Sequence, residues 1–101
     1  MPRRSQDLPE EFSAYEQALA RAMGARIRLR RNQLGLSQEQ VRARLEIKQV
    51  HISRSHYSRT ELGENLLRAS EIIALVHALD VSCSWLLFGD ESGPTRENQE
   101  A

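Results

Sequence analysis

Apolar residues recur at steps of three and four along the first third of the chain. The set comprises Phe12, Tyr15, Leu19, Ala22, Met23 and Ile27. This spacing places them on one side of a helix and predicts a helix over residues 10 to 33, with Gly24 as the one place where it could be interrupted. Asp7 lies three residues before Glu10, the spacing of a capping box, which marks the start of this helix.

Serine residues mark the starts of two further helices. Gly35 can adopt the left-handed conformation that ends a helix, and Ser37 can then cap a helix from Gln38 through Leu45. Ser53 is placed to cap a third helix over residues 54 to 61, with Gly63 at its end.

The densest apolar pattern lies between residues 69 and 79 and predicts a buried helix. Its members are Ile72, Ile73, Leu75, Val76 and Leu79. A short last helix, capped by Ser82 and ended by Gly89, holds the WLLF run (85–88). Residues 90 to 101 are polar and contain a Gly-Pro pair, which predicts a disordered tail. Since no segment shows a strand pattern, the predicted fold class is all-α.

Charge is distributed unevenly, although the formal net charge of the whole chain is zero. Residues 24 to 60 hold nine basic and two acidic residues, a net charge of +7, whereas residues 61 to 101 hold two basic and eight acidic residues. Such a basic block is typical of a domain with one side that faces phosphate. An ordinary solvated helix surface is the simpler alternative, but it does not explain why the basic residues are confined to one part of the chain.

The helix predicted over residues 54 to 61 has two chemically different sides at about 100° per residue. One side holds Arg54, Ser55, Ser58 and Arg59, and the other holds His56, Tyr57 and Thr60. Arginine can bond guanine O6 and N7 bidentately in the major groove, and serine can donate to a base edge or a phosphate. The first side is therefore a candidate DNA-reading surface, although many exposed helices share its composition.

The order and spacing of five segments resemble the Cro and phage-repressor class of helix-turn-helix DNA-binding domains, often called the Xre family. The matching segments are GARIRLRR (24–31), GLSQEQVRARL (35–45), SRSHYSRTELG (53–63), ASEIIALVHALDVS (69–82) and SWLLFG (84–89). The resemblance implies a five-helix DNA-binding domain over residues 24 to 89, with the recognition helix around 54 to 61. An N-terminal helical extension (1–23) would precede it and the polar tail (90–101) would follow.

The resemblance also implies roles for single side chains. It assigns base contacts to Arg54, Ser55 and Arg59. It assigns phosphate contacts to Ser53, Ser58 and Gln38. In the family this glutamine also braces the recognition helix. Glu61 matches the buried glutamate of the family's R-x-E-x-G ending, a structural role.

The turn before the recognition helix is longer than the family pattern by five residues, EIKQVHI (46–52) standing where two are usual. One extra helical turn through Lys48 would leave Val50 and Ile52 packed beneath the turn and would bring Lys48 or His51 near the DNA backbone. Alternatively, the insertion reorients the recognition helix and displaces its contacts.

The loop after the recognition helix reads GENLLR (63–68), where the family usually offers basic residues to phosphate. Glu64 would oppose a phosphate there, and Arg68 is the candidate that compensates. We therefore expect DNA binding that is weaker and more sensitive to salt than that of a repressor with a full basic clamp.

Other classes of function have little support in the sequence. Cys83, the one cysteine, is expected to be a small buried hydrophobe, and His51 and His56 stand five apart, so they do not share a helix face for a metal. We expect no metal, no cofactor and no enzymatic activity, because glycine-rich phosphate loops and protease segments are missing. No membrane span or secretory leader is recognised, which predicts a cytoplasmic protein.

Two apolar features are candidates for contacts between protein chains. Trp85 and Phe88 belong to the WLLF run, whose four large residues cannot all face inward, so they are assigned to the core or to a dimer. The apolar stripe before residue 24 either packs on its own domain, which we favour, or swaps across a dimer.

The sequence thus predicts a transcriptional regulator, with repression implied by the resemblance, that binds a pseudo-palindromic operator in double-stranded DNA as a homodimer. The alternative is a protein-interaction module of the same fold, antitoxin-like or adaptor-like, that uses its N-terminal or C-terminal apolar helix.

Overall fold

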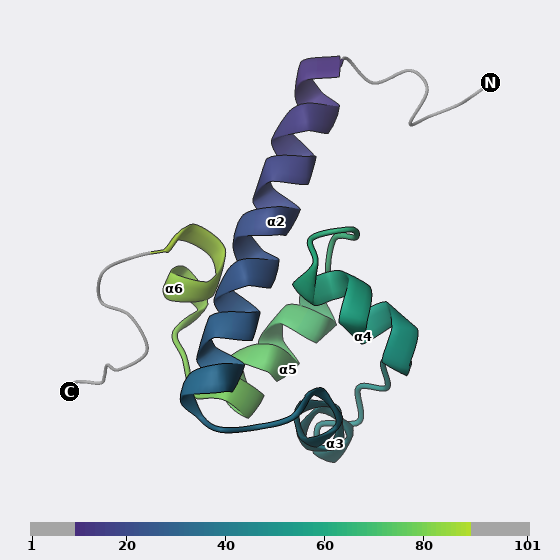
Figure 1. Cartoon of the computed structure of the whole chain (residues 1–101), viewed down its shortest axis with the longest axis vertical. Coiled ribbons are helices and arrows are strands. Elements are labelled where there is room, and N and C mark those ends of the chain that lie inside the picture. The colour runs from purple at the N-terminus through teal and green to yellow at the C-terminus, as the bar shows by residue number, and fades with distance from the viewer. Residues whose placement is uncertain (1–9, 90–101) are drawn as a thin grey trace.

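Five helices and no strand make up the part of the chain that the computed structural model describes, residues 10 to 89 (Figure 1). They are α2 (Glu10–Gln33), α3 (Gln38–Ile47), α4 (Arg54–Glu61), α5 (Ala69–Leu79) and α6 (Cys83–Phe88). The predicted all-α fold class is confirmed. Asp7 and the tail from residue 90 lie outside the described residues, as does the side chain of Phe12.

Gly24 does not interrupt α2, which runs unbroken through the predicted boundary at residues 23 and 24. Its role is close packing. A Cβ atom on Gly24 would lie 2.4 Å from the carbonyl oxygen of Thr60 and 2.7 Å from that of Glu61. Only a glycine therefore lets α2 approach the last turn of α4 this closely.

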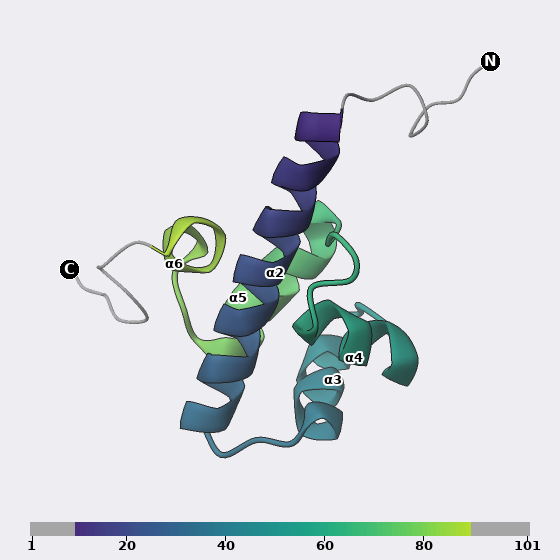
Figure 2. The ribbon, with the colours of Figure 1, turned by 45° about the horizontal axis from the view of Figure 1, so that its top comes forward.

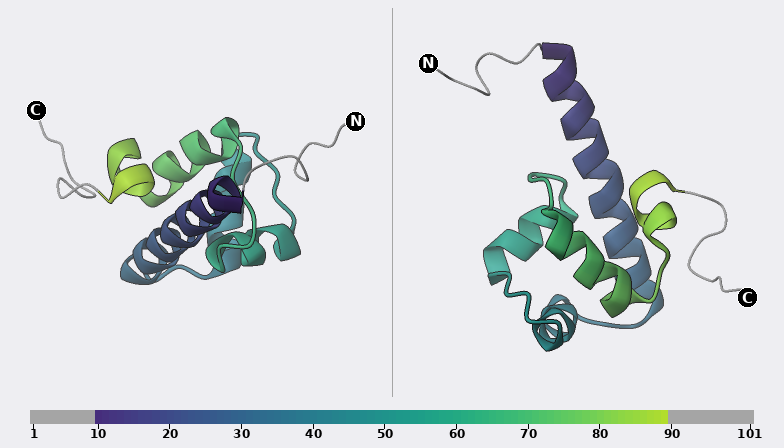
Figure 3. Two further views of the ribbon diagram at one scale, coloured as in Figure 1. Left: turned by 90° about the horizontal axis from the view of Figure 1, so that it is seen from above. Right: turned by 180° about the vertical axis from the view of Figure 1, so that it is seen from behind.

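The core is formed by one side of each helix around α5. Its fully buried large side chains are Ile27, Val41, Leu45, Tyr57, Leu75, Leu79 and Leu86. Seen from behind, α5 crosses the middle of the domain between α4 and α6 (Figure 3, right). The first half of α2 extends beyond the other helices (Figures 1 and 2).

Three predicted serine caps are confirmed. The Ser37 hydroxyl accepts from the Gln40 backbone N–H at 3.0 Å, while the Gln40 side chain accepts from the Ser37 N–H at 2.8 Å, a complete capping box. Ser53 accepts from the His56 N–H at 3.1 Å, and Ser82 accepts from the Trp85 N–H at 3.0 Å. These hydrogen bonds explain why the helix starts could be read from the sequence.

The long turn begins with an extension of α3 to Ile47, followed by a Schellman motif. Gln49 takes the left-handed conformation (φ 63°), and the Val50 N–H donates to the Leu45 carbonyl at 3.1 Å. Ile52 is buried and Val50 packs against the core, as the first of the two alternatives for this turn requires. The insertion is thus folded onto the domain.

Three expectations about burial were wrong. Ile73 is 57 % exposed, because neighbouring residues on a helix point about 100° apart and Ile72 and Ala74 take the inward positions. Cys83, the first residue of α6, is exposed and not a buried hydrophobe. Tyr15 is 65 % exposed, since that part of α2 extends past the other helices, whereas Met23 of the same predicted stripe is buried.

Candidate nucleic-acid interface

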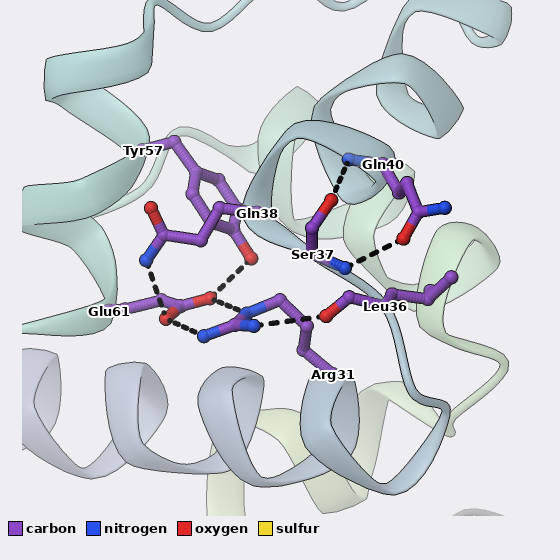
Figure 4. A network of polar contacts seen from close by, with 7 residues as sticks. All are labelled: Arg31, Leu36, Ser37, Gln38, Gln40, Tyr57 and Glu61. Carbon is purple, nitrogen blue, oxygen red and sulfur yellow. Dashed lines mark hydrogen bonds and ion pairs between the residues drawn. The ribbon is translucent and has the colours of Figure 1, made fainter.

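Glu61, at the end of α4, is the centre of a polar network that joins three helices (Figure 4). Its carboxylate accepts from Arg31 of α2 at 2.7 and 3.0 Å and from the Gln38 side chain of α3 at 3.1 Å. The Tyr57 hydroxyl donates to the same carboxylate at 2.6 Å. Three of these four hydrogen bonds join α4 to α2 and α3, and the fourth lies within α4. The buried structural role predicted for Glu61 is confirmed.

The charges in this network stabilise one another. Burial opposes ionisation of Glu61, but the hydrogen bonds from Arg31, Tyr57 and Gln38 outweigh it and hold the pKa of the carboxyl below its ordinary value. The hydrogen bond to Glu61 raises the pKa of Arg31. Burial, together with the carboxylate, raises the pKa of the Tyr57 hydroxyl, which stays protonated as the donor. The network is an ion pair at neutral pH.

Five of the nine basic side chains in residues 24 to 60 form hydrogen bonds within the domain. The prediction that the whole basic block faces phosphate is therefore corrected. Arg30 donates to the Leu79 carbonyl at 2.9 Å and Arg44 to the Ala78 carbonyl at 2.8 Å, both at the end of α5. Cations satisfy the free carbonyls that end a helix.

The other three make comparable bonds. Arg26 donates to the Leu86 carbonyl of α6 at 2.8 Å. Arg42 donates to the Ile52 carbonyl at 3.0 Å and so ties α3 to the residue before the α4 cap. Besides binding Glu61, Arg31 donates to the Leu36 carbonyl at 3.0 Å. Their charges are engaged by the fold.

The remaining four basic side chains of that block are exposed and make no hydrogen bond or ion pair within residues 10 to 89. They are Arg28, Lys48, Arg54 and Arg59. Arg54, Ser55 and Arg59 lie on the exposed side of α4, and Ser58 is half-buried beside them. Tyr57 and Thr60 are buried on the opposite side. The two-sided pattern predicted for this helix is therefore present.

Gln38 connects two shallow depressions on this surface. The first, of about 350 Å³, is lined by Ser37, Gln38, Glu39, Arg42 and Arg54. The second, of about 230 Å³, is lined by Arg28, Arg31, Gln38, Ser58, Glu61 and Leu62. A continuous surface thus runs from Arg54 across the start of α3 to Arg28; we call it the α3–α4 face.

Arg28 and Leu62 on this face were not among the predicted site residues. Arg28 stands one helical turn before Arg31, and this spacing was the signal that could have placed it beside Gln38. Leu62, 58 % exposed, stands next to the buried Glu61 at the end of α4. It brings an apolar surface to a face otherwise made of arginine, serine and glutamine.

The other predicted site residues lie apart from these two depressions. Lys48 is exposed at the end of α3, where the neighbouring His51 ring pairs with Glu46 at 2.8 Å. Arg68 is exposed at the start of α5, and its backbone N–H donates to Glu71 at 2.9 Å. The Ser53 hydroxyl accepts the hydrogen bond that caps α4.

Trp85 and Phe88, assigned jointly to core or dimer, separate in the structure. Trp85 packs against the core, whereas Phe88 is 78 % exposed. His56, on the inner side of α4, lies 3.1 Å from the Asn65 amide and 3.7 Å from the Glu71 carboxylate. It therefore points away from the exposed side of α4.

Two further findings concern the described residues alone. No group of three or more His, Cys, Asp or Glu side chains is arranged to hold a metal ion among residues 10 to 89. None of the helices in that range is long and apolar enough to cross a membrane.

Comparison with known proteins identifies the class. Residues 22–83 match a family described as a helix-turn-helix domain, and because this is more than half of the chain, the protein belongs to that family. Helix-turn-helix domains bind DNA through the second helix of the motif. No curated protein and no solved structure matches the chain. Membership of the narrower Cro and phage-repressor class stays a prediction.

Proposed function

We propose that this protein is a sequence-specific DNA-binding transcriptional regulator that places α4 in the major groove and binds a pseudo-palindromic operator as a homodimer. The observation that carries the proposal is the division of its basic residues. Five arginine side chains are hydrogen-bonded within the domain. Arg54, Arg59 and Arg28, in contrast, remain free around one face that also carries exposed serine.

Each part of the α3–α4 face suits a different part of DNA. Arg54 and Ser55 open α4 and would reach base edges, with Arg59 one and a half turns further along. Gln38 would contact phosphate through the part of its amide that Glu61 leaves free, next to the start of α3. Arg28 would neutralise a second phosphate on the other side of Gln38.

Ser53, Ser58, Lys48 and Arg68 remain weaker candidates for phosphate contact. The last two lie apart from the two depressions, so their contribution depends on how the DNA bends around the domain. Occlusion of polymerase is the mode of action that the resemblance to phage repressors favours, and it would follow from operator binding alone.

In vitro selection on random duplex DNA tests this function. The wild-type protein should enrich a palindrome, and the Arg54→Ala, Arg59→Ala variant should lose it while keeping the fold by circular dichroism. Arg96→Ala, far along the sequence in the tail, is the matched control. If neither the wild type nor the control enriches any sequence, the protein is not a sequence reader.

A protein-interaction module of the same fold is the second candidate, and the exposed Phe88 side chain favours it. This function predicts that Phe88→Ala abolishes biological activity while Arg54→Ala, Arg59→Ala does not. The regulator predicts the reverse.

A further inference from the structure

α2 carries apolar residues on two opposite sides. One side is buried in the domain through Ala20, Met23 and Ile27. The other side presents what we call the outer stripe, with steps of three, four, three and four residues: Tyr15, Ala18, Ala22, Ala25 and Leu29. Ala22 is half-buried and the other four are exposed, Tyr15 to 65 % and Leu29 to 51 %.

The outer stripe has no partner among the described helices. α2 lies on the outside of the bundle, with α6 on one flank and α4 on the other (Figure 1; Figure 3, left). Alternating steps of three and four are the spacing by which two helices pair along a common seam. Three central alanines would let the backbones of such a pair approach closely.

The charges along α2 indicate which helix would fit. Its acidic residues, Glu10, Glu11 and Glu16, all precede Arg21 and Arg28, the two arginines of the helix that make no hydrogen bond or ion pair within residues 10 to 89. A second α2 running in the opposite direction would set the acidic half of each helix against the basic half of the other, and would also oppose the two helix dipoles. A parallel pair would bring like charges together.

We propose that the outer stripe binds the same stripe of a second copy of this chain in antiparallel orientation. Arg21 and Arg28 border the stripe without a partner within residues 10 to 89 and, with Ala25, Leu29 and Leu62, line a shallow depression of about 460 Å³. The pair would cover the part of this depression next to Arg21 and Ala25 and bring acidic residues of the second copy to Arg21, leaving Arg28 to the α3–α4 face.

The sizes of the side chains set the register. A two-fold axis between Ala18 and Ala22 pairs each Ala18 with Ala22 of the second copy, and each Tyr15 with Ala25 of the second copy. Tyr15 then meets a small side chain on both sides of the axis, and Leu29 lies beyond the paired residues. This surface deepens the proposed function, because it supplies the homodimer that a palindromic operator needs.

Disulfide cross-linking tests orientation and register together. All variants carry Cys83→Ser, which removes the one native cysteine. Protein with Tyr15→Cys, mixed with protein carrying Ala25→Cys, should form a covalent dimer on mild oxidation. Tyr15→Cys alone should not, because the two copies of residue 15 would stand about 15 Å apart along the axis at 1.5 Å per residue. A dimer from Tyr15→Cys alone, or none from the mixture, overturns the proposal.

Sedimentation of variants without cysteine substitutions tests the same surface by a second route. Ala18→Glu with Ala25→Glu should be monomeric at concentrations at which the wild type is dimeric, while Ala43→Glu, an exposed alanine on α3, should stay dimeric. Failure here is separable from failure of the regulator. If cross-linking fails but selection returns a palindrome, only the surface is wrong; if the pair forms and selection returns nothing, only the function is wrong.

Discussion

The two regions that hold this domain together differ in chemistry. Where α2, α3 and α4 meet, Glu61 accepts four hydrogen bonds from Arg31, Gln38 and Tyr57. Where α5 meets the other helices, the contacts are those of fully buried leucines, among them Leu75 and Leu79. Hydrogen bonds are directional and apolar burial is not. The first region therefore fixes the orientation of α4, and the second supplies most of the stability.

The largest effect should come from the apolar region. Leu75→Ala removes a fully buried side chain and should lower the free energy of unfolding by about 2 to 5 kcal/mol. Ile73→Ala, two residues earlier on the same helix but 57 % exposed, is the control and should cost much less. Urea denaturation measures both. Equal losses would mean that the core is not centred on α5 as described.

The polar region should respond in a different way. Glu61→Gln keeps the size of the side chain but leaves Arg31 without its carboxylate, and should cost about 1.5 to 3 kcal/mol. Because the amide keeps one acceptor oxygen instead of two, Arg31, Gln38 and Tyr57 can no longer all donate to it, and DNA affinity should fall further than the loss of stability explains. Leu75→Ala, measured while it is still folded, should bind DNA like the wild type. If both variants lose DNA affinity to the same extent, the polar region does not have the separate role of orienting α4.

Acid should weaken the polar region alone. The pKa of Glu61 is lower in the folded protein than its ordinary value near 4.5, so its contribution to stability is present above that value and is lost as the pH falls through the folded pKa. The stability difference between wild type and Glu61→Gln should therefore shrink below about pH 4.5. Leu75→Ala should keep a constant difference from the wild type. A Glu61→Gln difference that is undiminished at pH 3 would contradict the ion pair.

The range of the interactions explains which features of the fold could be predicted from the sequence. Helix starts follow from local signals, so the caps at Ser37, Ser53 and Ser82 placed the first residues of three helices correctly. The structural role of Glu61 follows from the resemblance, whose R-x-E-x-G ending is itself a pattern of neighbouring residues. These features depend on residues that are close in the sequence.

What the sequence missed depends on contacts between distant residues. Arg30 and Arg44 look like surface charges until the end of α5 is placed beside them. Gly24 looked like a helix breaker, since the approach of Thr60 cannot be seen from its neighbours. Ile73 fits an apolar pattern that a helix can bury only in part. The set of basic side chains left free for a partner is therefore smaller than the basic block suggested.

The smallest expected effect concerns the long turn between α3 and α4. Gln49 has a left-handed backbone conformation (φ 63°). This conformation is strained for a residue that has a Cβ atom, whereas glycine adopts it with little strain. Gln49→Gly should raise the free energy of unfolding by about 0.5 to 1 kcal/mol, less than the change in the core or at Glu61. Thermal or urea unfolding would show it.

The opposite change at a matched site is the control. Gly35 has a similar conformation (φ 70°) with no neighbouring atom within 4 Å, so Gly35→Ala should destabilise through backbone strain alone, by about 1 kcal/mol. Because Gln49 touches neither Glu61 nor the exposed side of α4, Gln49→Gly should leave DNA affinity unchanged. Lower affinity in this variant would show that the rigid turn, and not only the polar network, sets the position of α4.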